Sequence, residues 1–172
     1  MHMKTKTGSG LSSSSYPKFY PHITLASLAH LQGLTEAIPQ YETPIVCSFK
    51  SIDIGDVYYR SVYVSIVPDN SILYLHKRVH ENLRIEPRTP SFPHMSLVYI
   101  DDEDAAKGER QRYYELLKDA GKFEVVGEAV KLCGQGLEDL IDGFEARQIW
   151  AVDCNGPVEG WQIIAKYSLL KV

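Results

Sequence analysis

Apolar and polar side chains alternate along several stretches of the chain, and this alternation predicts β-strands. Each stretch is also rich in β-branched and aromatic residues, which favour an extended backbone. Between the second and third stretches, Gly55-Asp56 predicts a short hairpin connection. The expected strands cover residues 22–28, 45–54, 57–67, 94–100, 123–132, 148–154 and 161–170.

Two other stretches have the spacing of helices. Leucine and valine recur at near-helical intervals over residues 70–83, directly after Asp69 or Asn70, either of which suits a helix N-cap. A run of four acidic residues begins at Asp101 and predicts the start of a second helix, because carboxylates are stabilised near a helix N-terminus. We expect that helix to run to about residue 120 and to end at Gly121.

The predicted order mixes helices with hairpin-connected strands, which indicates the α+β class rather than a doubly wound parallel sheet. With 172 residues, the chain is long enough for one domain, or for one domain of two lobes. Residues 1–16 are polar without a hydrophobic face, so we expect a flexible arm. A single domain is then expected over residues 17–172. Residues 31–42 stay unassigned, because Pro39 would interrupt a helix there.

Charge and composition limit the expected partners. The formal net charge of −4 argues against long nucleic acids, which select basic surfaces, but is compatible with a small phosphorylated substrate. Every apolar run falls short of the ~20 residues that a membrane helix needs, so no membrane insertion is expected. The three cysteines are too few and too widely spaced for a disulfide framework. Together with the lack of a recognisable secretory signal, the cysteine pattern indicates a reducing intracellular compartment, cytoplasmic by default.

A short internal repeat is the most informative feature of the sequence. Residues 20–25 read Tyr-Pro-His-Ile-Thr-Leu, and residues 92–97 read Phe-Pro-His-Met-Ser-Leu. Both copies fit the pattern aromatic, Pro, His, apolar, hydroxyl, Leu, although the whole chain holds only six histidines. The repeat therefore marks these two segments as the leading candidates for a functional site.

The spacing inside each copy predicts which side chains act together. Because residues i and i+2 share one face of a strand, His22 lies beside Thr24 and His94 lies beside Ser96. Imidazoles titrate near neutral pH, so one can serve as a general base while the other serves as a general acid. The hydroxyls can donate hydrogen bonds to a phosphoryl oxygen as its charge develops. Phosphodiester cleavage needs this combination of groups.

Other interpretations of the histidines remain open. A single His-x-Thr on a strand is usually structural, but the repetition favours a functional role. Two histidines could bind zinc, yet Thr and Ser are not usual zinc ligands and no third ligand has a recognisable spacing, so no metal is expected. His76 and His80 form an i,i+4 pair on the predicted helix and also lack an evident third ligand. Tyr58 and Tyr59 are candidates for stacking on a nucleobase.

The repeat resembles the signature of the 2H phosphoesterase superfamily. In that superfamily, two similar α+β lobes with antiparallel sheets flank a central cleft, and each lobe carries one His-x-[Ser/Thr] motif. The resemblance narrows to the cyclic phosphodiesterases, and to their fungal branch in particular, which act on 2′,3′-cyclic nucleotides and on ADP-ribose 1″,2″-cyclic phosphate. The stretches that carry it are FYPHITLASL, VYYRSVYV, SFPHMSLVY and the closing IWAVDCNGPVEGWQIIAKYSL.

The resemblance implies hydrolysis without metal or cofactor, in which the bond to the 3′ oxygen breaks and a 2′-phosphate remains. It implies that His22 and His94 are the acid–base pair and that Thr24 and Ser96 bind the phosphate. Tyr99, five residues after His94, matches a substrate-contacting tyrosine of relatives. Strict strand alternation nevertheless places Tyr99 on the face opposite His94, unless the strand bends or ends before it.

The chain departs from the family at its start. Relatives begin with a strand and a long helix, whereas only the polar arm precedes Tyr20, so an N-terminal strand and helix are expected to be missing. A nucleotide-binding module that has lost turnover is therefore one alternative. An RNA-end phosphodiesterase or a 2′,5′-phosphodiesterase of the same superfamily is another. The resemblance further implies a role downstream of tRNA splicing and an association with the Golgi or another internal membrane system. We expect a monomer whose partner is the small cyclic phosphate.

Overall fold

The computed structural model describes residues 10–89, 91–133 and 140–171. Over these ranges the fold is α+β, as expected, and each pair of neighbouring strands is antiparallel. The strands are β1 (Ile45–Val57), β2 (Arg60–Ile66), β3 (His94–Val98), β4 (Phe123–Val126), β5 (Ala129–Cys133), β6 (Leu140–Ile141), β7 (Gly143–Ala146), β8 (Gln148–Asp153) and β9 (Gln162–Ser168). The helices are α1 (Leu34–Ala37), α2 (Asn70–Leu83), α3 (Asp102–Ala106), α4 (Glu109–Asp119) and the 3₁₀ turn η1 (Val158–Gly160).

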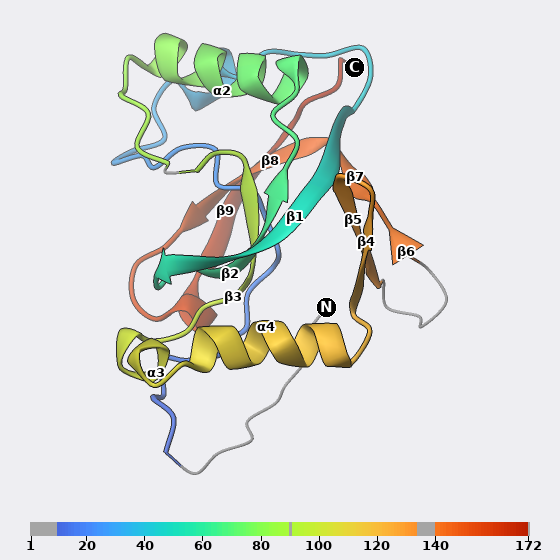
Figure 1. The fold of residues 1–172 in the computed structure, drawn as a ribbon. Helices are drawn as coiled ribbons and strands as arrows, with labels where there is room; N and C mark the ends of the chain where they lie inside the picture. Colours follow the sequence, from blue (N-terminus) through green and yellow to red (C-terminus); the bar gives the residue numbers. More distant parts are fainter. Residues whose placement is uncertain (1–9, 90, 134–139, 172) are drawn as a thin grey trace.

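Three sheets make up the β part of the described fold. The largest has the strand order β3-β2-β1-β7, the second has the order β4-β5-β6, and β8 pairs with β9. In Figure 1, α2 covers one end of this arrangement and α4 lies at the opposite end. The arrangement into two similar lobes remains a prediction.

The largest sheet supplies much of the core. Alternate residues in the first half of β1 are buried, among them Cys47 and Phe49, while their neighbours are exposed. Val64 of β2 and Leu75 of α2 belong to the same apolar cluster. Burying apolar side chains yields about 25 cal/mol per Å² of area removed from water, so this cluster is a main stabilising element.

The helix predicted over residues 70–83 is confirmed as α2. Asp69 is its N-cap, because its carboxylate accepts a hydrogen bond from the backbone N–H of Ile72 at 3.0 Å. The predicted strands 45–54, 57–67, 94–100, 148–154 and 161–170 correspond to β1, β2, β3, β8 and β9, with shifted ends.

The hairpin prediction at Gly55-Asp56 was wrong by three residues. Both residues lie inside β1, and the turn consists of Tyr58 and Tyr59, because Val57 pairs with Arg60. Gly55 is required for another reason. A Cβ atom there would lie 1.9 Å from the carbonyl oxygen of Arg60, so the two backbones approach too closely for a side chain.

Two predicted elements are interrupted by glycines in the left-handed region. The single helix expected over residues 101–120 is two helices, α3 and α4, separated at Gly108 with φ 85°. The strand expected over 123–132 is a hairpin of β4 and β5, which turns at Gly127 with φ 63°. Glycine adopts these positive φ values without the steric penalty of a Cβ atom.

The strand expected over residues 22–28 is not formed. Only Ile23 makes a bridge, to Met95 of β3, and the rest of the segment has no ladder. Pro21 lacks a backbone N–H to donate, which limits pairing on that side. The short strands β6 and β7 were not predicted.

Part of the expected flexible arm is attached to the fold. The Ser15 hydroxyl donates to the carboxylate of Asp104 at 2.6 Å, and the Tyr16 hydroxyl donates to Glu109 at 2.5 Å. The Tyr16 backbone N–H also donates to the carbonyl of Tyr99 at 2.9 Å. Residues 1–9 of the expected arm lie outside the described residues.

The close approach at Gly55 gives a stability prediction. Gly55→Ala should lower the free energy of unfolding by about 1–3 kcal/mol, because the new methyl group forces the two strands apart. Chemical denaturation measures this change. Gly160→Ala is the control, since a Cβ at Gly160 has no heavy atom within 4 Å. Equal stabilities of the two variants would contradict the close approach.

Candidate functional site

The two copies of the repeat meet at the edge strand β3. The antiparallel bridge between Ile23 and Met95 sets the register of the first copy against the second. If this register continues, His22 faces Ser96 and Thr24 faces His94. We therefore expect all four side chains to share one face, called here the motif face, with Ile23 and Met95 on the core face.

Tyr99 also belongs to the motif face, because β3 contains a bulge. Ser96 pairs with Tyr63, but Val98 pairs with Val62, so β3 holds one extra residue at Leu97. Val98 therefore points to the core face, and Tyr99 after it turns to the face of Ser96. Strict alternation gave the wrong face for Tyr99.

Both histidines are held through the same ring nitrogen. The Nδ1 atom of His22 lies 2.6 Å from the carbonyl oxygen of Tyr20, and that of His94 lies 3.1 Å from the carbonyl oxygen of Ser91. A carbonyl oxygen only accepts hydrogen bonds, so Nδ1 carries the proton in each ring. The neutral form of either histidine then has an unprotonated Nε2, which is the nitrogen that can accept a proton.

The two histidines differ in their surroundings. His94 is 9% exposed, whereas His22 is exposed. Burial lowers the pKa of His94 below its ordinary value, and the positive charges of Arg60 and His22 lower it further, against the effect of the Ser91 carbonyl. His94 therefore favours its neutral form near neutral pH.

The two hydroxyls of the repeat also differ. Ser96 is buried, and its hydroxyl donates to the carbonyl oxygen of Tyr59 at 2.7 Å. Thr24 is exposed, and no described residue shares a hydrogen bond with its hydroxyl. The motif face thus holds one hydroxyl that is bound within the protein and one that is open to solvent.

Aromatic side chains surround Tyr99 beside the motif face. Phe19 stacks on the Tyr99 ring at 4.1 Å between centroids, and Tyr59 meets it edge-on at 5.4 Å. The ring centroid of Trp161 lies 5.9 Å from that of Tyr59, and Tyr59 is 56% exposed. The sequence singled out Tyr59 but not Phe19 or Trp161, because their proximity depends on contacts between distant segments. Burial raises the pKa of the Tyr99 phenol far above its ordinary value, so this hydroxyl stays protonated.

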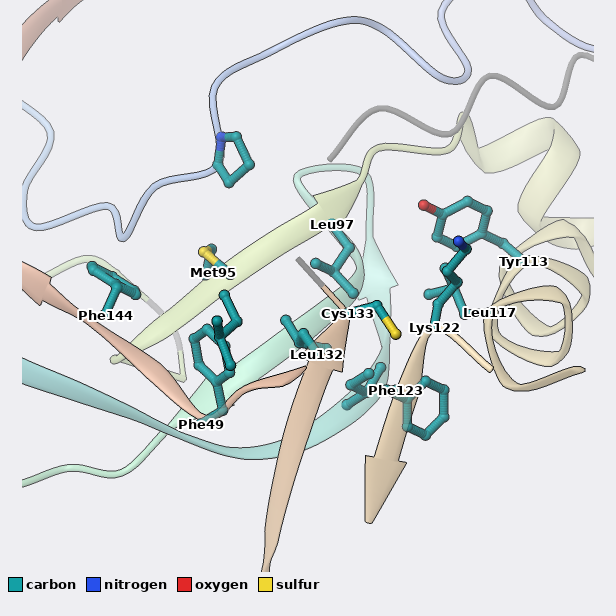
Figure 2. Close-up of a pocket in the computed structure, with 13 residues that line it drawn as sticks. Phe49, Met95, Leu97, Tyr113, Leu117, Lys122, Phe123, Leu132, Cys133 and Phe144 are labelled. Carbon is teal, nitrogen blue, oxygen red and sulfur yellow. The ribbon is translucent and has the colours of Figure 1, made fainter. Parts of the chain in front are cut away.

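The other face of the sheet lines an apolar cavity of about 300 Å³. Figure 2 shows Met95 and Leu97 of β3 facing Leu132 and Phe123 across it, with Lys122 near one end. Because Met95 and His94 point to opposite faces, this cavity is separate from the histidine site. It belongs to the space between the largest sheet and the β4–β5 hairpin.

Within the described ranges, no three His, Cys, Asp or Glu side chains gather closely enough to hold a metal ion. The pair formed by His76 and His80 lies elsewhere, against Phe92, with 4.1 Å between the ring centroids of His76 and Phe92. Among the helices that the structure describes, none has the length and apolar composition needed to cross a membrane.

Comparison with known families identifies the class of protein. Residues 7–169 match the family described as cyclic phosphodiesterase-like protein. The chain belongs to this family, which confirms the resemblance seen in the sequence and indicates a cyclic phosphodiesterase activity. No curated protein matched the chain.

The lowered pKa values predict how stability depends on pH. Burial lowers the pKa of His94, and burial together with His80 lowers that of His76. The unfolded chain then binds more protons than the folded one below the ordinary histidine pKa of ~6.5, so the free energy of unfolding should decrease as pH falls through that value. Denaturation at about pH 5.5 and about pH 7.5 measures this. His76→Gln should weaken the pH dependence; an unchanged dependence would contradict the contribution of His76.

Proposed function

We propose that the protein hydrolyses small cyclic phosphates without a metal. Its substrates are nucleoside 2′,3′-cyclic phosphates, which yield nucleoside 2′-phosphates, and ADP-ribose 1″,2″-cyclic phosphate, which yields ADP-ribose 1″-phosphate. The observation that supports this proposal is the bridge between Ile23 and Met95, which brings the two copies of the repeat side by side. Family membership supports the same class of reaction. Compounds of this kind arise downstream of tRNA splicing, which we propose as the source of the substrate.

In the proposed reaction, His94 is the general base and His22 is the general acid. His94 favours the neutral form, so its Nε2 accepts a proton from the attacking water. The water oxygen forms the new bond to phosphorus as the bond to the 3′ oxygen breaks. Protonated His22 gives its proton to the departing 3′ oxygen and, because it is exposed, regains one from solvent. The proton taken by His94 returns to solvent.

The hydroxyls and Tyr99 would bind the phosphoryl oxygens. Thr24 is open to solvent and can donate directly. Ser96 donates to the carbonyl of Tyr59 in the free protein, so it must turn away from that carbonyl to reach the phosphate. The protonated Tyr99 hydroxyl is a further donor on the same face. Donors placed where negative charge develops lower the barrier.

The exposed ring of Tyr59 provides a surface for the nucleobase. Stacking of a base on an aromatic ring contributes ~1–3 kcal/mol to binding and accepts different bases. The Tyr59 ring packs against the rings of Trp161 and Tyr99, and these two contacts fix its position. This arrangement supports a nucleotide, rather than a bare cyclic phosphate, as the substrate.

Product analysis tests the reaction directly. Incubation with 2′,3′-cyclic AMP in excess EDTA should yield the 2′-phosphate, because the proposed chemistry uses only side chains. His22→Ala and His94→Ala should each lower kcat by about 10²–10⁴-fold, the usual contribution of one proton-transfer group. Wild-type activity abolished by EDTA would overturn the metal-free mechanism. Binding of the cyclic nucleotide without turnover, measured by calorimetry, would instead favour a nucleotide-binding module.

The hydroxyls of Thr24 and Ser96 should contribute similarly to the reaction rate but differently to the stability of the fold. Thr24→Ala and Ser96→Ala should each lower kcat by about 10–10³-fold through loss of one transition-state donor. Thr24→Ala should leave the free energy of unfolding nearly unchanged, because Thr24 is exposed. Ser96→Ala should also destabilise the fold by about 1 kcal/mol, because the bond to the Tyr59 carbonyl is lost. Steady-state kinetics and denaturation separate the two effects, and full activity of both variants would exclude the proposed phosphate contacts.

A further inference from the structure

Arg60 occupies a fixed position at the start of β2, next to the motif face. Its side chain is 13% exposed, although Asp56, its ion-pair partner, is 81% exposed. One terminal nitrogen donates to Asp56 at 2.7 Å, and the other donates to the Ser91 hydroxyl at 2.6 Å. The guanidinium carbon lies 5.6 Å from the centre of the Tyr63 ring. A guanidinium can make these contacts together because its donors form a rigid fork.

Two of the three neighbours of Arg60, Ser91 and Tyr63, contact His94. The carbonyl oxygen of Ser91 accepts the hydrogen bond from His94 Nδ1, and the Tyr63 ring meets the His94 ring edge-on at 5.4 Å. Ser91 is one of the few non-glycine residues with positive φ, at 54°. A serine in this region is strained, so it needs an outside contact to hold it. The hydrogen bond that Arg60 donates to the Ser91 hydroxyl is such a contact.

We propose that Arg60 is a positioning residue for His94, which acts by holding Ser91 and Tyr63 against the imidazole. This inference rests on the proposed function, because it explains how His94, the general base of the proposed reaction, is oriented. By fixing Ser91, Arg60 keeps the proton on Nδ1 of His94 and leaves Nε2 free to accept one from water. Arg60 itself touches neither reacting atom.

Arg60 also contributes a charge near His94. The groups around His94 are Tyr63 and Arg60 from β2, His22 from the segment opposite β3, and Asp56, which pairs with Arg60. Asp53 of β1 lies on the same face, where it accepts hydrogen bonds from Ser51 and Ser65. The positive charge of Arg60 acts with burial to favour neutral His94.

Three variants separate the contact from the charge. Arg60→Met removes both, so the pKa of His94 should rise and kcat should fall by about 10–100-fold, the cost of a misplaced catalytic group, with KM little changed. Arg60→Lys keeps the positive charge but loses the forked pair of guanidinium donors. The pKa of His94 should therefore stay close to its wild-type value, while kcat still falls. Ser91→Ala removes the hydroxyl contact but keeps the strain of the positive φ, and should lower kcat in the same way.

The readout is NMR of the His94 ring, together with steady-state kinetics. The His94 signal is identified by its loss in His94→Gln. Nitrogen chemical shifts report which ring nitrogen carries the proton, and Arg60→Met should reduce the population with the proton on Nδ1. Arg147→Met is the matched control, because Arg147 also pairs with a neighbouring carboxylate, Glu145, at 2.6 Å. It should change neither the His94 signal nor kcat.

The inference is overturned if folded Arg60→Met matches Arg147→Met in the His94 pKa, the ring tautomer and kcat. If Arg60→Met does not fold, Ser91→Ala decides the question, and an unchanged tautomer and kcat in that variant would refute the positioning role. Failure of the proposed function is distinguishable. If the wild-type protein turns over no cyclic phosphate, the NMR signals still show whether Arg60 controls the His94 ring.

Discussion

The pairing of one residue, Ile23, with Met95 is the constraint on which the site depends. The two copies of the repeat are separated by about seventy residues of chain, and this bridge sets one against the other. A slip of one residue would turn His22 and Thr24 to the core face. The remaining features of the site, from the Tyr99 bulge to the stacked Phe19, lie around this register.

The two copies share a sequence pattern but have different surroundings. The second copy lies on β3, where His94 and Ser96 are buried and bonded to backbone carbonyls. The first copy lies on a segment with one bridge, and both His22 and Thr24 are exposed. Burial lowers the pKa of His94, so two copies of the same residue type have different electrostatic surroundings.

The two faces of β3 have separate tasks. The core face packs Met95 and Leu97 around an apolar cavity, and so joins the sheet to the β4–β5 hairpin. The motif face carries the polar and aromatic groups of the site. Because side chains alternate, the strand that is anchored by the core also fixes the histidine, and rigid elements position catalytic groups better than loops do. The geometry of His94 is therefore tied to the stability of the fold.

The sequence by itself determined the α+β class, α2 with its cap, most strands and the four residues of the repeat, because these depend on local periodicity and spacing. It placed the turn at Gly55 instead of Tyr58-Tyr59, because the close approach of Arg60 is invisible in the sequence. Only the tertiary structure decided the face of Tyr99, through a bulge that breaks alternation. It alone decided the burial of His94 and the contact of Arg60 with Ser91, because pairing between distant strands brings these residues together.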